Sequence, residues 1–219
     1  MINKKTLDFL AQLSLNNNKE WFEKNRSLYE LAKNNFKELV EELILNVSKF
    51  DTTIKQLEAK NCIFRINRDV RFSKNKAPYK NNFGALLAPG GRKSVDAGYY
   101  IQIQPNESFA AGGMWHPPGP KINAIRQEID YNTKEFKKII ANRNFKKDFG
   151  ELSTEDKLQS APKGYDKTHP EIELLKHKSF IVVHDFKDKE VIAGDFTKKV
   201  TTCFESMYPL NSFLRRACD

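Results

Sequence analysis

The chain has 219 residues, 39% of them hydrophobic, and a formal net charge of +9. This length suits one domain with one sizeable core, and a mean hydropathy of −0.64 without an apolar run near the roughly 18 residues of a membrane span argues against a transmembrane protein. No continuous apolar segment typical of a signal peptide follows Met1, and the three cysteines lack the CxxC spacing of zinc sites. We therefore expect a single domain over 1–219, a cytoplasmic location, no membrane association, and no metal or cofactor.

The N-terminal quarter is predicted to be helical. A short helix is expected over 6–14, and from Asn18 to Phe50 apolar residues recur every three or four positions, which indicates one long helix or two with a bend. The asparagines at 16–18 lie between these segments and supply side chains that cap helix N-termini.

The middle of the chain is predicted to form strands. Runs rich in aromatic and β-branched residues lie near 62–66, 82–88, 97–103 and 108–115, separated by Gly, Pro and Asn clusters. The connections at 89–91 and 105–107 are short and turn-like, so they favour antiparallel hairpins over helical crossovers.

The remainder of the chain returns to helices. After the prolines of 117–120 the helical period resumes over 122–140, with a division near Asn132. A helical turn is expected within 169–177, a buried strand at 179–184, and a closing segment over 194–217 that is one kinked helix or two helices, because Pro209 interrupts it. The whole pattern predicts an α+β fold in which a mainly antiparallel sheet of about five strands packs against the long N-terminal helix and C-terminal helices.

The positive charge is concentrated in one stretch. Residues 64–93 hold eight basic residues and a single acid, Asp69, whereas the rest of the chain is nearly balanced. A local field of one sign attracts anions such as phosphates, nucleic acid or acidic surfaces. Two further basic clusters lie around Lys163 and Lys178, and the sequence leaves open whether they join this stretch.

The residues of 64–72 alternate between apolar and polar, which places Arg65, Asp69 and Arg71 on one face if the segment is extended. Asp69 would then orient the guanidinium group of Arg65 or Arg71, and such groups bind phosphate or carboxylate oxygens in a bidentate manner. A structural ion-pair network fits this pattern equally well. The loop that follows adds Lys76 and Lys80, either as a cationic rim or as a solvated loop.

Two further predicted strands carry candidate residues that line a binding site. Tyr100 and Gln102 share the polar face of strand 97–103, which either lines a pocket or is the solvated side of the sheet. Trp115 and His116 come at the end of a strand with small residues, where a ligand can approach closely. A structural role for His116 is the alternative.

Five strings occur in order and span nearly the whole chain: NNNKEWFEKNRSLYE, FRINRDVRFSKNKAPYKNNFG, GYYIQIQPNESFAAGGMWHP, APKGYDKTHPEIELLKHKSF and PLNSFLRRA. They resemble the family catalogued as domain of unknown function 2461, found in bacteria and fungi. This resemblance implies one domain and a bacterial, cytoplasmic origin, and it transfers no activity and no catalytic residues.

Three hypotheses for function follow. The first is a pocket for a small phosphate- or carboxylate-bearing ligand, and spacing identifies no nucleophile with its base, so an enzymatic activity stays open. The expected ligand-binding residues are Arg65, Arg68, Asp69, Arg71, Lys76, Tyr79, Lys80, Tyr100, Gln102, Trp115 and His116. The second is nucleic-acid binding by 64–93, with Phe72, Tyr79 or Phe83 stacking on bases. The third is docking of an acidic protein, and the oligomeric state is left open.

Overall fold

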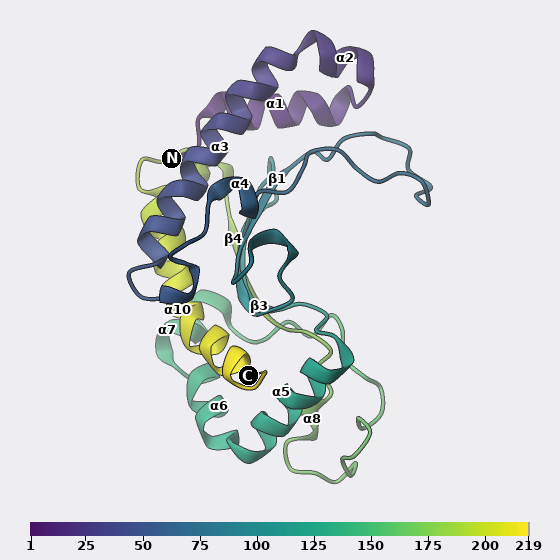
Figure 1. Cartoon of the computed structure of the whole chain (residues 1–219), viewed down its shortest axis with the longest axis vertical. Helices are drawn as coiled ribbons and strands as arrows, with labels where there is room; N and C mark the ends of the chain where they lie inside the picture. The colour runs from purple at the N-terminus through teal and green to yellow at the C-terminus, as the bar shows by residue number, and fades with distance from the viewer. Residues whose placement is uncertain (219) are drawn as a thin grey trace.

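The computed structural model describes residues 1–218 and has an α+β architecture (Figure 1). A four-stranded antiparallel sheet has the order β1-β2-β3-β4, so each strand pairs with its neighbour in sequence. The strands are β1 (Phe83–Leu87), β2 (Gly98–Ile103), β3 (Ser108–Met114) and β4 (Phe180–Phe186). The α-helices are α1 (Lys4–Leu15), α2 (Lys19–Lys24), α3 (Arg26–Val47), α4 (Ala59–Cys62), α5 (Gly119–Tyr131), α6 (Thr133–Ile140), α7 (Arg143–Phe149), α8 (Ile172–Leu175), α9 (Asp188–Val191) and α10 (Phe196–Arg216). Short 3-10 turns cover Thr52–Ile54 and Gly91–Lys93.

Most of the predicted elements are confirmed. The strands expected at 82–88, 97–103, 108–115 and 179–184 are β1 to β4, and the helix expected over 122–140 is divided at Asn132 into α5 and α6. The N-terminal segment consists of two helices, α2 and α3, which meet at Asn25. Asn18 caps α2 by accepting a hydrogen bond from the amide of Trp21 at 2.9 Å. The closing segment is a single helix, α10, that continues through Pro209.

The expected strand at 62–66 is wrong, and the sheet of the described chain has four strands instead of about five. Ile63 makes an isolated bridge to Ala85, and the amide of Phe64 donates to the carbonyl oxygen of Gly84 at 2.9 Å. The chain then leaves the edge of β1, because the backbone of 66–68 pairs with that of 78–80. Residues 64–82 therefore form an irregular hairpin that projects beyond the sheet, which we call the basic arm (Figure 1).

One face of the sheet is covered by helices. Tyr99, Ile101 and Ile103 of β2 are fully buried on this face, and Phe36 of α3 stacks on Phe83 with ring centroids 5.5 Å apart. A Cβ atom at Gly112 would collide with the side chain of Met207, so glycine allows α10 to lie directly against β3. Phe180, Val182 and Phe186 of β4 complete this buried layer.

The opposite face, which we call the open face, lies away from α3 and α10. Successive side chains of a strand point to opposite faces, so Tyr100 and Gln102 of β2 and Phe109 and Ala111 of β3 belong to it. In Figure 1 the basic arm at one end of the sheet and α5 at the other both project toward this side. The molecule is thus crescent-shaped, with the open face on its inner side.

Candidate functional site

The basic arm is held together by two of the cations that the sequence suggested as ligand clamps. Arg68 donates from Nη1 to the carbonyl oxygen of Ala77 at 2.9 Å and from Nη2 to Ser73 Oγ at 3.3 Å. Lys76 donates from Nζ to the carbonyl oxygen of Val70 at 3.1 Å. Arg68 and Lys76 therefore use part of their hydrogen-bonding capacity inside the arm.

Near the tip of the arm, Asp69 and Arg71 form a bidentate ion pair. Arg71 donates from Nε to Asp69 Oδ1 at 3.0 Å and from Nη2 to Oδ2 at 2.6 Å, and these hydrogen bonds hold the pKa of Asp69 below its usual value. Both side chains are exposed, and the guanidinium group of Arg71 also lies 5.8 Å from the ring of Phe72. Phe72 itself is 95% exposed, so the tip presents an aromatic ring and a cation to solvent.

Tyr79 anchors the base of the arm. It is buried, and its ring stacks on Phe22 of α2 with centroids 4.0 Å apart. The side chain of Asn17 donates to the carbonyl oxygen of Tyr79 at 2.9 Å and accepts from its amide at 3.0 Å, as a neighbouring strand would. Tyr79, predicted from the sequence as a ligand-binding residue, thus contacts the protein interior and fixes the direction of the arm.

Three aromatic rings form a line where the arm meets the open face. The ring centroids of Phe64 and Tyr100 are 6.2 Å apart, and those of Tyr100 and Phe109 are 5.6 Å apart. All three side chains are half-buried, so each keeps some surface toward solvent. We call Phe64, Tyr100 and Phe109 the aromatic row.

Two cations, Lys80 and Arg65, lie at the Phe64 end of the aromatic row. Lys80 Nζ is 5.4 Å from the centroid of the Phe64 ring, and the pKa of Lys80 is lowered by burial and by the positive charge of Arg65. Arg65 is exposed. Within residues 1–218 neither cation lies within ion-pair distance of a carboxylate. The pKa of Asp69 is lowered mainly by its hydrogen bonds from Arg71 and to a smaller extent by the charge of Arg65. Because the Asp69 carboxylate is paired with Arg71, Arg65 and Lys80 keep positive charge that attracts an external anion.

A line of polar side chains continues from the aromatic row along β2. The hydroxyl of Tyr100 donates to Gln102 Oε1 at 3.0 Å, and Gln102 Nε2 donates to Gln104 Oε1 at 2.9 Å. Burial raises the pKa of Tyr100 to about 12, so its hydroxyl keeps the proton that it donates. Gln104 accepts a further bond from Asn82, which fixes the orientation of the Gln102 amide.

Trp115 and His116 lie at the opposite end of the sheet from the arm. The arm joins β1 at Phe83, which pairs with the end of β2, and the end of β2 in turn pairs with the start of β3. Trp115 and His116 follow Met114, the last residue of β3, which pairs with Phe180. The structure thus brings Lys80, Tyr100 and Gln102 together around Phe64, with Arg65 close to Lys80. Trp115 and His116 lie at the other end of β3, beyond Ala111, which pairs with Tyr100.

The basic cluster around Lys178 belongs to the end of the sheet that carries His116. Lys178 Nζ binds Asp156 Oδ1 at 2.7 Å, and the other carboxylate oxygen of Asp156 lies 3.0 Å from His116 Nε2. The charge of Lys178 is therefore compensated locally.

The sequence analysis missed Phe64 and Phe109. Phe64 was assigned only to the apolar side of 64–72, and Phe109 to a strand of unknown register. The signal for Phe109 lies in the pairing of β2 with β3, which sets it opposite Gln102 and diagonal to Tyr100. The register between two strands is not contained in the alternation within either of them.

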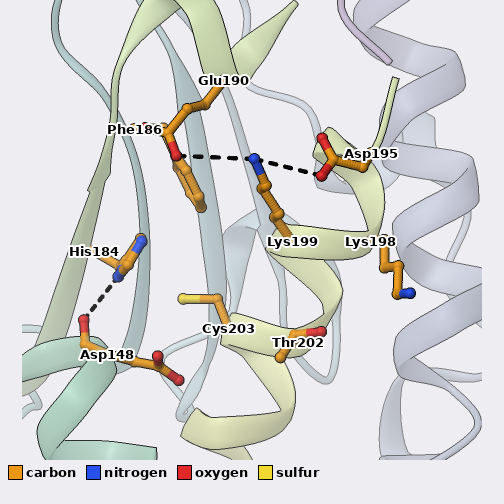
Figure 2. Close-up of a pocket in the computed structure, with 9 residues that line it drawn as sticks. All are labelled: Asp148, His184, Phe186, Glu190, Asp195, Lys198, Lys199, Thr202 and Cys203. Carbon is orange, nitrogen blue, oxygen red and sulfur yellow. Dashed lines mark hydrogen bonds and ion pairs between the residues drawn. The ribbon is translucent and has the colours of Figure 1, made fainter. Parts of the chain in front are cut away.

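A hollow of about 340 Å³ lies on the helical side of the sheet, between β4 and α10 (Figure 2). Its lining residues are Asp148, His184, Phe186, Glu190, Asp195, Lys198, Lys199, Thr202 and Cys203. Figure 2 shows Lys199 between Glu190 and Asp195, at 4.0 and 3.4 Å, and His184 Nδ1 donating to the carbonyl oxygen of Asp148 at 2.7 Å.

The residues that line this hollow do not favour binding of an anion. Three carboxylates face two lysines, and the lysine at its centre is already paired. Burial raises the pKa of the Cys203 thiol, so it is protonated and weakly nucleophilic. A second hollow, of about 420 Å³ beside Pro209, likewise contains none of the residues that the sequence suggested.

Neither a metal centre nor a membrane span is indicated by the described residues. Among residues 1–218 no cluster of His, Cys, Asp and Glu is arranged to hold a metal ion. No helix in the same range has the length and apolar content that crossing a membrane requires.

Comparison with known proteins identifies a family for this chain. No curated protein and no solved structure matches the chain. A family model described as "Conserved hypothetical protein (DUF2461)" matches residues 5–213, which includes the basic arm, the whole sheet and most of α10. The chain therefore belongs to this family of conserved hypothetical proteins, domain of unknown function 2461.

Proposed function

We propose that the open face and the basic arm bind single-stranded nucleic acid. The observation that carries the proposal is the aromatic row with Arg65 and Lys80 beside it, two cations without an ion pair in the described chain. Proteins that bind single strands combine rings on which bases stack with cations that follow the phosphates. Stacking is sequence-tolerant, because every base has a π-face.

In this proposal the open face and the basic arm make different contacts with the nucleic acid. The aromatic row stacks on bases, Arg65 and Lys80 bind the adjacent phosphates, and the exposed side chain of Lys74 on the arm extends the positive track. The oriented amide of Gln102 supplies a hydrogen-bonding group next to the stacked bases. Asp185 of β4 pairs with Phe109 and is exposed, so it places a carboxylate beside the same bases and weakens binding.

A small anionic ligand is the second candidate. Arg65 is close enough to Lys80 to contribute to its lowered pKa, and one phosphate or carboxylate between the two cations relieves that repulsion. Small-ligand sites are usually enclosed pockets, whereas these residues lie on an open sheet face and line neither of the two hollows described above. The surface therefore favours an extended anion over a compact one, and an acidic protein partner is distinguished by the test below.

The test measures binding of a fluorescently labelled single-stranded oligonucleotide by anisotropy as a function of salt. The expected result is an affinity that falls with salt, with a slope reduced by about 1.4 when two phosphate contacts are removed in the double variant Arg65→Gln/Lys80→Gln. Phe109→Leu removes one stacking ring and is expected to weaken binding by about 5- to 100-fold. Asp185→Asn is expected to strengthen it.

The matched control is Lys5→Gln, which removes an exposed lysine on α1 that forms no ion pair in the described chain and is expected to leave the slope unchanged. Absence of binding at low salt contradicts the proposal. Binding of inorganic phosphate or a mononucleotide that is lost in the double variant, with no binding of oligonucleotides, identifies the small-ligand alternative. Binding of an acidic polypeptide without any oligonucleotide binding identifies the docking alternative.

A further inference from the structure

An exposed tryptophan lies at the far end of the open face. Trp115 follows β3 directly and is 72% exposed, whereas Trp21 is half-buried and packs on Phe9 with ring centroids 6.0 Å apart. An indole ring is the largest flat apolar surface that a side chain offers, and its exposure is unfavourable in isolation. Such a ring in water is well suited to stack on a flat ligand.

The backbone after Trp115 is held in an unusual conformation. His116 has a φ of 44°, in the left-handed region, which costs a non-glycine residue on the order of 1 kcal/mol or more. Two contacts of His116 offset this conformational cost. Its backbone amide donates to Ser179 Oγ at 3.0 Å, and its ring atom Nε2 lies 3.0 Å from Asp156 Oδ2. The ring of His116 also meets the Trp115 ring edge-on, with centroids 4.6 Å apart, so the indole packs against an anchored residue.

The surface between the aromatic row and Trp115 is formed by small and apolar residues. Phe109 and Ala111 lie on the open face of β3, and Trp115 follows the end of this strand. Gly113 interrupts the alternation, because its φ of 115° would direct a Cβ atom into the backbone of Phe180. The neighbouring strand β4 places Val183 opposite Ala111 and Ile181 opposite Gly113. Small side chains between two aromatic positions leave room for a strand of bases to lie across the sheet.

We infer that Trp115 is a second stacking residue for the same nucleic-acid strand, which lies along β3 from the aromatic row to the Trp115–His116 corner. The inference rests on the proposed function and adds a minimum length for the ligand. Trp115 lies six residues after Phe109, which corresponds to about 20 Å of extended chain. At about 3.4 Å per step of a stacked strand, about six steps cover this distance, so a stacked ligand that reaches both ends has about seven nucleotides.

The test uses the fluorescence of Trp115 itself. In the variant Trp21→Phe, Trp115 is the remaining tryptophan of the chain, and it is titrated with single-stranded oligonucleotides of about 4 to about 16 nucleotides. The expected result is that the shortest oligonucleotides bind without quenching Trp115, whereas those above about six nucleotides quench it and bind more tightly. Trp115→Ala is expected to lower the affinity of the long oligonucleotides by about 5- to 100-fold and to leave that of the shortest unchanged.

Two further variants isolate stacking from other effects. Trp115→Phe keeps a ring and is expected to retain most of the affinity for long oligonucleotides. Tyr131→Ala removes an aromatic side chain of similar exposure, 73%, from the end of α5 and is expected to change nothing.

The outcomes separate this inference from the proposed function. No binding at any length contradicts both. Binding that Phe109→Leu weakens, while Trp115→Ala has no effect at any length and Trp115 is not quenched, overturns the inference and leaves the proposed function intact. An equal loss of affinity for oligonucleotides of every length in Trp115→Ala also overturns the inference. A stacking residue at the far end of the sheet contacts only the long oligonucleotides.

Discussion

Arg65 and Arg68 lie three residues apart in the basic arm and have different surroundings. Arg68 donates to a carbonyl oxygen and a hydroxyl of the arm, whereas Arg65 is exposed and has no carboxylate within ion-pair distance in the described chain. Arg71 is neutralised by Asp69. The net charge of the segment therefore overstates the number of cations that are free to bind a ligand, and the arm offers fewer of them than its composition suggests.

His177 has the clearest dependence on pH. It is 3% exposed, and among residues 1–218 its Nδ1 has no hydrogen-bond partner. Burial, with a further contribution from Lys157, lowers its pKa to about 4. The pKa of His177 in the folded protein lies below the unfolded value of about 6.5, so the unfolded chain takes up a proton first as the pH falls. The contribution of His177 to the free energy of unfolding is therefore fully present above about pH 6.5 and is lost as the pH falls toward about 4. The loss amounts to as much as about 3 kcal/mol.

The variant His177→Phe tests this assignment, since it keeps a ring next to Phe180 and removes the titrating group. The free energy of unfolding, measured by urea denaturation, is expected to depend less on pH between about 6.5 and 4 than in the wild type. An unchanged pH dependence would assign that range to other groups.

At the scale of elements, the direction of the basic arm is determined by the linker between α1 and α2. Asn17 in that linker binds the backbone of Tyr79, and Phe22 stacks on its ring. The arm itself pairs with its own backbone over 66–80. It meets the sheet at its two ends, where Phe64 donates to Gly84 of β1 and residue 82 leads directly into β1. A predicted fifth strand thus becomes a projecting hairpin, because its hydrogen-bonding groups find partners in the segment that follows it.

We expect Asn17→Ala to release the arm locally. The substitution removes two hydrogen bonds to Tyr79, worth about 1–2 kcal/mol in total. Hydrogen–deuterium exchange is expected to become faster at the amides of Arg68, Tyr79 and Lys80 and to stay unchanged in the sheet. Asn16→Ala is the matched control, because the side chain of Asn16 donates to the carbonyl oxygen of Gln12 in α1. Faster exchange in both variants would refute a specific role for Asn17.

At the scale of the whole molecule, a buried ion pair joins segments that are far apart in sequence. Asp51 is 1% exposed, and it accepts from Arg215 Nη2 at 2.7 Å and from the hydroxyl of Tyr99 at 2.8 Å. Burial raises the pKa of Asp51, but hydrogen bonds from Thr53, Arg215 and Tyr99 and the charge of Arg215 outweigh burial and hold it below its usual value. The pair fastens the end of α10 to β2 and to the turn after α3.

Two adjacent arginines give a direct comparison of buried and exposed pairs. Arg215→Met leaves Asp51 buried without its cation and is expected to lower the free energy of unfolding by about 3–5 kcal/mol. Arg216→Met breaks exposed pairs with Glu128 and Glu135 and is expected to cost less than about 1 kcal/mol. Urea denaturation of both variants measures the difference, and equal losses would contradict a special role for the buried pair.

The local elements and the location of the charge were determined by the sequence alone. Periodicity and turn residues predicted the four strands that form the sheet, the long helices and the division at Asn132, because these patterns depend on neighbours along the chain. The fifth strand that they predicted, at 62–66, is absent from the sheet of residues 1–218. Concentration of cations in 64–93 likewise follows from composition.

Only the tertiary structure decided which of those residues meet. Strand register placed Phe109 beside Tyr100, pairing of the arm with itself turned 62–66 away from the sheet, and the length of β3 separated Trp115 from Lys80. Side-chain alternation assigns a face within one strand, whereas contacts between strands depend on the packing of the entire core, which no local pattern records.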